Sequence, residues 1–142
     1  MQEYGRILLP VPNKLAVIIL NWRIINMDFK DQPFIPMLFG GDINTYSVAR
    51  AFYEEYQVKT YVFGKFPSGP SYNSNIIEYH ADLKIDTDDV FMKTVRDFAA
   101  AHADKTVLTI GCGDSYVALC SRHKDEMPKN VVAPYIDFEL MD

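Results

Sequence analysis

The chain has 142 residues, of which 49% are hydrophobic, 23% charged and 13% aromatic, with 14 basic and 19 acidic side chains. This length and apolar content suit one globular domain and exclude an intrinsically disordered chain. Two cysteines are too few for a disulfide-stapled scaffold. The net charge of −5 gives no general attraction to nucleic acid or anionic lipid. The composition therefore predicts a single, soluble, mildly acidic domain.

The N-terminal residues 1–26 contain one apolar run, Leu15–Leu20. This run is too short to span a bilayer, and Asn21, Trp22 and Arg23 follow it where a signal peptide needs small residues. We expect the run to form an added strand or a short buried helix. A cytoplasmic location with reduced thiols is the expectation.

Strands and helices alternate from residue 33 onward. Short apolar or β-branched runs predict strands at 34–39, 58–63, 76–80 and 106–110, and a last strand within 131–136. Apolar stripes at helical spacing predict helices around 49–56, from a capped start at 86–89 to His102, and over 116–127. This alternation predicts an α/β three-layer sandwich with a mainly parallel sheet of four or five strands. Pro36 cannot donate to a neighbouring strand, so we expect its nitrogen to face no partner.

Three loops should leave the carboxyl edge of this sheet, where open α/β sheets bind ligands. In the first loop, Gly40 and Gly41 would let the backbone approach a ligand, and the N–H groups of the following helix would bind an anion. A tight turn in which Asp42 or Asn44 caps the helix is the alternative.

The second loop, with Gly111, Gly113, Asp114 and Ser115, has the same two interpretations. Because both glycine loops follow parallel strands, we expect them to be neighbours, within about 15 Å. Cys112 has no identifiable base beside it, which favours a structural role.

The third loop, residues 65–74, offers the cation of Lys65 and several hydroxyls to a phosphate or carboxylate, although solvation alone also explains its composition. No P-loop is present, and Tyr116 stands where a dinucleotide fingerprint needs its third glycine. No metal-ligand motif is present either, so no bound metal is expected in this chain.

Five segments in order resemble the N-terminal, pre-ATP-grasp domain of ATP-grasp ligases, in particular carboxylate–amine ligases of the carbamoyl-phosphate-synthase-like and D-aspartate-ligase-like group. The segments are residues 34–46, 49–56, 69–74, 110–114 and 132–137. The resemblance runs from about Asp31 to Asp142. It implies a Rossmann-like domain over residues 27–142, preceded by an N-terminal extension, residues 1–26, that has no counterpart.

The resemblance implies an enzyme that activates a carboxylate with ATP as an acyl phosphate and then couples it to an amine. In such ligases this domain forms one wall of the substrate site. The implied substrate-binding residues are Gly40, Gly41, Asp42, Asn44, Lys65, Gly111, Gly113, Asp114 and Ser115. The resemblance implies that ATP and Mg²⁺ bind to an ATP-grasp domain, which we expect to be absent from this chain. The chain alone is therefore expected to be inactive, with no catalytic residue and no cofactor of its own.

Two alternatives remain open: a non-catalytic Rossmann-like module that binds a nucleotide or anion, and a docking subunit for a separately encoded ATP-grasp chain. A small carboxylate or amine is the expected ligand, with no nucleic-acid or membrane partner. Residues 135–141 are rich in large apolar side chains, and Leu15–Leu20 also needs a partner. Both features predict a homodimer.

Overall fold

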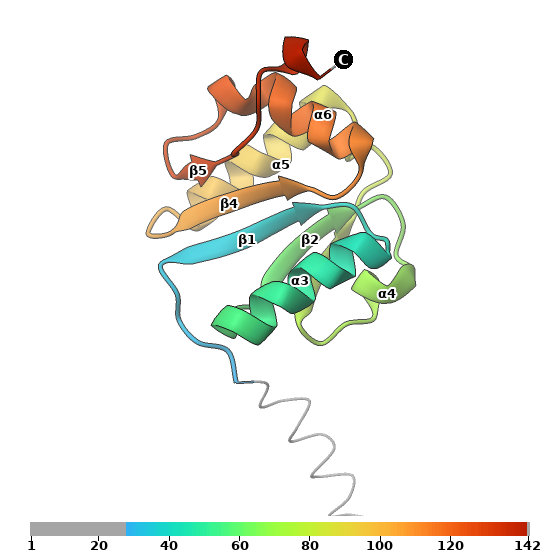
Figure 1. Ribbon diagram of the computed structural model, residues 1–142, viewed down its shortest axis with the longest axis vertical. Coiled ribbons are helices and arrows are strands. Elements are labelled where there is room, and N and C mark those ends of the chain that lie inside the picture. The colour runs from blue at the N-terminus through green and yellow to red at the C-terminus, as the bar shows by residue number, and fades with distance from the viewer. Residues whose placement is uncertain (1–27, 142) are drawn as a thin grey trace, which may run out of the picture.

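The computed structural model describes residues 28–141, and the Leu15–Leu20 run lies outside them. The elements alternate as the sequence predicts (Figure 1). The strands are β1 (Phe34–Phe39), β2 (Thr60–Gly64), β3 (Ile77–Ala81), β4 (Thr106–Gly111) and β5 (Val131–Val132). The helices are α3 (Ile43–Tyr56), α4 (Gly69–Tyr72), α5 (Asp88–Ala101) and α6 (Asp114–His123), with 3₁₀ turns η1 (Lys124–Glu126) and η2 (Phe138–Leu140).

The five strands form one sheet in the order β3-β2-β1-β4-β5, and every neighbouring pair is parallel. The chain moves outward from β1 to β2 and β3, then returns to the other side of β1 for β4 and β5. The strand order thus reverses between β1 and β4, which is the topological switch point of a doubly wound sheet. The predicted α/β fold with a parallel sheet is confirmed.

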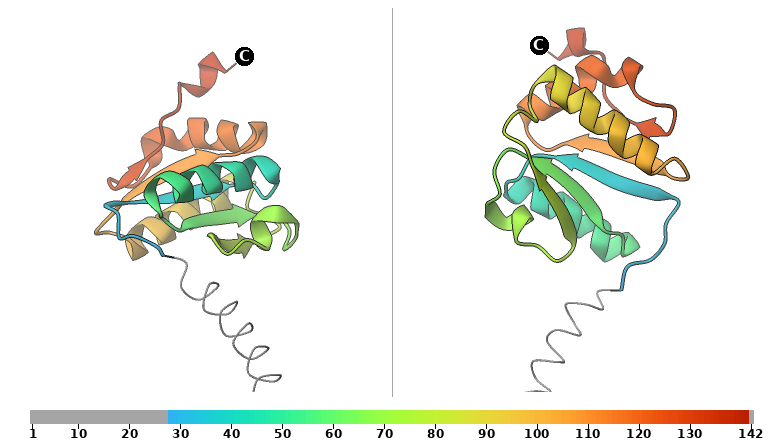
Figure 2. Two further views of the ribbon diagram at one scale, coloured as in Figure 1. Left: turned by 60° about the horizontal axis from the view of Figure 1, so that its bottom comes forward. Right: turned by 180° about the vertical axis from the view of Figure 1, so that it is seen from behind.

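Helices lie on both faces of the sheet, which makes the three layers (Figure 2). An apolar core fills the space between each face and its helices. Side chains alternate along β1, so Met37 and Phe39 join the core beneath α5 and α6, whereas Leu38 joins the core beneath α3. Phe91 of α5 is fully buried against Phe39, with ring centroids 4.6 Å apart. Burying a side chain of this size stabilises the fold by roughly 1.5–3 kcal/mol.

Pro36 lies in the central strand, and the hydrogen-bond pattern explains why it is tolerated. Gly40 N donates to Phe63 O of β2 (3.0 Å), so the even-numbered backbone nitrogens of β1 face β2. The register with β2 begins only at Met37, opposite Tyr61. The nitrogen of Pro36 therefore points to a position before β2 begins, in line with the expectation.

Several element ends differ from the sequence prediction: α3 begins at Ile43 and β2 at Thr60, and further differences concern α5, α6 and β5. No side chain caps α5, because the Thr87 hydroxyl donates to Lys84 O instead. Helix α6 ends at His123, so Met127 lies beyond η1 rather than on the helical stripe. Strand β5 has only two residues and pairs with Val107 and Leu108 alone, after which the chain leaves the sheet.

Candidate functional site

The turns that follow β1, β2 and β4 meet at the switch point. Gly40 N donates to Phe63 O at the end of β2, and Cys112 N donates to Phe39 O at the end of β1 (2.8 Å). The two glycine loops are therefore neighbours on one edge of the sheet, as predicted.

Gly40 shows how closely these turns approach. Its φ of +138° is a conformation that side chains disfavour. A Cβ here would lie 2.5 Å from Thr45 Oγ1 and 2.9 Å from Cys112 O. The β1–α3 turn can thus touch the β4–α6 turn only because this residue is glycine.

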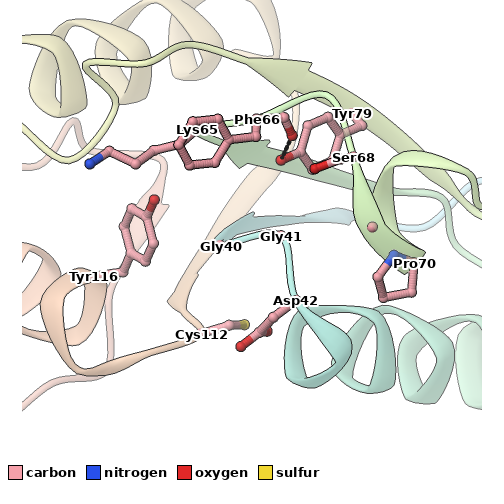
Figure 3. A pocket seen from close by; sticks show the side chains of 11 residues that line it. Gly40, Gly41, Asp42, Lys65, Phe66, Ser68, Pro70, Tyr79, Cys112 and Tyr116 are labelled. Atoms are coloured by element: carbon pink, nitrogen blue, oxygen red, sulfur yellow. Dashed lines mark hydrogen bonds between the residues drawn. The ribbon is translucent and has the colours of Figure 1, made fainter.

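An open pocket of about 370 Å³ lies where the turns meet (Figure 3). Its lining comes from all three turns, from β3 and from the first turns of α4 and α6. The lining residues are Gly40, Gly41, Asp42, Lys65, Phe66, Ser68, Gly69, Pro70, Tyr79, Cys112 and Tyr116.

Four of the nine implied substrate-binding residues line this pocket: Gly40, Gly41, Asp42 and Lys65. The other five do not. Asn44 lies in the first turn of α3, Gly111 ends β4, and Gly113 precedes α6. Ser115 is exposed on the first turn of α6, and Asp114 lines a separate hollow with Phe138.

Asp42 caps α3. Its Oδ1 accepts hydrogen bonds from Asn44 N and Thr45 N (both 3.1 Å) and from the Thr45 hydroxyl (3.2 Å). Since the carboxylate already satisfies these two N–H groups, they are not free to bind an anion. The helix-cap interpretation of the first loop therefore holds for Asp42.

Lys65 contributes a shared positive charge at the pocket. Its ammonium lies 2.6 Å from Asp86 Oδ2, and both side chains are about one-third exposed (37% and 33%). Tyr116 lines the same pocket, near Asp86. Burial, and then the nearby charge of Asp86, raise the pKa of its hydroxyl. Because a solvent-exposed ion pair contributes little to the stability of the fold, an anionic ligand can compete with Asp86 for Lys65.

Tyr79 is a pocket residue that the sequence does not reveal. Its hydroxyl donates to Phe66 O (2.8 Å), and burial raises its pKa. The ring reaches across from β3 because Gly41 and Gly64 leave room: Cβ atoms there would lie 2.7 and 2.0 Å from its hydroxyl. From the sequence, Tyr116 is predicted only to begin the apolar stripe of the helix over 116–127. No pattern in the sequence marks either side chain as part of a site.

The two cysteines are buried, free thiols. Burial is the main cause that raises the pKa of Cys112, which keeps the thiol protonated and weakly nucleophilic. This favours the structural role expected for Cys112, although its side chain reaches the pocket wall (Figure 3).

Within residues 28–141, no group of three or more His, Cys, Asp or Glu side chains is placed to hold a metal ion. No helix in the same part of the chain is long and apolar enough to cross a membrane.

The fold and the pocket define a doubly wound α/β domain with a ligand-sized hollow at its switch point. Among curated proteins, the chain is similar to a D-aspartate ligase of Enterococcus faecium (strain Aus0004), with 34% identity over 116 residues. The aligned region covers 80% of this chain and 28% of the ligase, so the chain spans just over a quarter of that protein's length. No protein-family model and no solved structure matches the chain. The predicted resemblance to a D-aspartate ligase is thus confirmed at the level of sequence.

Proposed function

We propose that this chain is the N-terminal, substrate-binding part of an ATP-dependent carboxylate–amine ligase of the D-aspartate ligase type, and that its switch-point pocket binds the small amino-acid substrate. One observation carries the proposal. Three turns from separate strands converge on one pocket, in a chain whose sequence similarity to D-aspartate ligase covers 80% of its length.

The charges around the pocket support a zwitterionic or dicarboxylic ligand. Lys65 supplies a cation that a substrate carboxylate can take over from Asp86. The carboxylate of Asp42 at the opposite wall suits an ammonium group.

In the proposed ligase, the carboxylate is activated as an acyl phosphate before the amine attacks it. ATP and Mg²⁺ would be held by an ATP-grasp domain outside this chain. The role of the pocket is to bind and orient one substrate, and the isolated chain should show no ATP turnover. A cytoplasmic location, where ATP is available, fits this role.

Calorimetric titration of the chain with D-aspartate tests the proposal. We expect a dissociation constant in the millimolar range, about −4 kcal/mol, and no tight binding of ATP with Mg²⁺. Lys65→Ala should weaken D-aspartate binding by about tenfold, since it removes one charge-assisted contact. Lys59→Ala is the matched control, because Lys59 has a similar exposure and pairs with Glu78 outside the pocket.

Two results would contradict the proposal. Micromolar binding of ATP would favour a nucleotide-binding module instead. Equal losses of D-aspartate affinity in Lys65→Ala and Lys59→Ala would show that the ligand responds to surface charge and not to this pocket.

A further inference from the structure

The segment that follows β5 returns to the sheet beside the pocket. It belongs to the 132–137 motif, which the proposed function does not use. Gly111 N, at the end of β4, donates to the hydroxyl of Tyr135 at 2.6 Å. This contact joins two residues that are 24 positions apart in the sequence.

The hydrogen-bond pattern of β4 explains why this contact matters. Val107 N donates to Asn130 O (2.7 Å), so the odd-numbered nitrogens of β4 face β5. Strand β5 pairs only with Val107 and Leu108, and the Gly111 N–H lies on the same edge, beyond its end. The Tyr135 hydroxyl supplies the acceptor that a longer β5 would have provided.

We propose that Tyr135 is a positioning residue for the switch-point pocket: its hydroxyl takes the place of a strand carbonyl at the unpaired end of β4 and holds the β4–α6 turn against Gly40. The turn is then anchored on both edges. Tyr135 binds Gly111 N on one side, and Phe39 O accepts from Cys112 N on the other (2.8 Å).

The anchored turn forms part of the pocket wall. Cys112 and Tyr116 line the pocket, and the Cys112 carbonyl lies where a Cβ on Gly40 would touch it. A shift of the Gly111 backbone therefore moves this wall and its contact with the β1–α3 turn. The inference rests on the proposed function only for the identity of the ligand in the pocket.

Tyr135 is itself held in place. Burial, and then the nearby thiol of Cys120, raise the pKa of its hydroxyl, so the phenol stays protonated. The segment after it is tied to α6, since the Ser121 hydroxyl donates to Ile136 O (2.5 Å) and Arg122 stacks 4.8 Å above the Phe138 ring. An ion pair between Lys124 and Asp137 completes the attachment.

Amide resonances of the full ¹⁵N-labelled chain test the proposal, with Tyr135→Phe as the variant and Ser121→Ala as the matched control. In Tyr135→Phe, hydrogen exchange of the Gly111 amide should be about tenfold faster, because one net hydrogen bond is lost. The resonances of Cys112 and Gly40 should shift, and the affinity for D-aspartate should fall. Ser121→Ala removes only the bond to Ile136 O, and the contacts of Arg122 with Phe138 and of Lys124 with Asp137 still attach the segment, so these resonances and this affinity should stay as in the wild type.

A purely structural role would lower the melting temperature and leave the native resonances of Cys112 and Gly40 unchanged. That result would overturn the proposal. The wild-type chain gives a second test that needs no variant: the Gly111 amide should be protected from exchange as strongly as the Cys112 amide. Lack of protection at Gly111 would also overturn it. If D-aspartate does not bind the wild type, the proposed function fails, and the amide measurements still decide the role of Tyr135.

Discussion

At the scale of single residues, the pocket depends on positions that carry no side chain. Gly64 ends β2 where the Tyr79 ring crosses toward Phe66. A Cβ at Gly64 would lie 2.0 Å from the Tyr79 hydroxyl and 2.6 Å from the Gly40 carbonyl oxygen. The tyrosine could rotate away, whereas the backbone oxygen of Gly40 cannot move without displacing the β1–α3 turn.

Gly64→Ala should therefore destabilise the fold by about 1–3 kcal/mol, which is the usual cost of forcing extra volume into a packed site. Thermal unfolding should show a melting temperature lower by roughly 3–10 °C. Ser68→Ala is the control, because Ser68 is exposed in the same loop and its side chain makes no capping hydrogen bond. An equal melting temperature for Gly64→Ala and the wild type would show that this close approach is unimportant.

The sequence predicts some residue roles and misses others for a physical reason. Glycine pairs after strands mark turns that approach a ligand or one another, so Gly40 and Gly41 could be assigned to the site. Tyr79 and Tyr116 could not, because their roles depend on which strands lie side by side. The sequence is consistent with Asp42 either at a ligand-binding turn or as the cap of the helix. The hydrogen bonds that Asp42 accepts from Asn44 N and Thr45 N show that it is the cap.

At the scale of elements, one carboxylate links α5 to α6. Asp88 Oδ1, in the first turn of α5, accepts from Arg122 Nη1 (2.8 Å) and lies 2.6 Å from His123 Nε2. The hydrogen bonds from His123 and then Arg122 hold the pKa of Asp88 below its ordinary value of 3.8. A carboxylate whose pKa is lower in the folded state stabilises the fold fully when the pH is above its pKa in the unfolded state. This stabilisation is lost as the pH falls through its pKa in the folded state.

Asp88→Asn should accordingly lower the melting temperature at pH 7. The difference in melting temperature from the wild type should shrink as the pH drops below the ordinary pKa of an aspartate carboxyl group. Thermal unfolding over a series of pH values measures this. Asp89→Asn is the control, because Asp89 lies in the same helical turn and makes no ion pair within the described residues. A difference that stayed constant down to strongly acidic pH would contradict the account.

Element boundaries were less predictable than the elements themselves. Apolar periodicity located β1 and α5 because each buries a regular face in the core. Helix α6 and β5 end earlier than their apolar patterns suggest. In both, apolar side chains beyond the element, such as Met127 and Tyr135, pack on the core from irregular backbone. Periodicity reports burial, and these residues are partly buried without being helix or strand.

At the scale of the whole molecule, the doubly wound order follows from the alternation of strands and helices, but the sequence alone does not fix which strands are neighbours. The reversal between β1 and β4 brings the first and second glycine loops together, and adjacency of β1 and β2 adds the third. The shared edge is predictable because the sheet is expected to be mainly parallel, so that the carboxyl ends of its strands meet at one edge. The exact lining of the pocket could not, since it depends on this strand order.

The expected homodimer stays a prediction. One of its two supports, Leu15–Leu20, lies outside the described residues. The other, the C-terminal segment, exposes Ile136 (59%), Phe138 (41%) and Leu140 (68%). Light scattering at micromolar concentration should give about twice the chain mass of 16.3 kDa. A mass near 16.3 kDa would contradict the prediction, and deletion of residues 1–26 would show which segment holds the dimer.

The most direct test of the central claim is to locate D-aspartate on the ¹⁵N-labelled chain by NMR titration. The account predicts that the saturating shifts concentrate on the turns after β1, β2 and β4, at Gly40, Gly41, Lys65, Cys112 and Tyr116. Amides at the opposite end of the sheet, such as Thr106 at the start of β4, should not move. Shifts centred away from the switch point, or no saturable shift at all, would contradict the claim that this pocket is the substrate site.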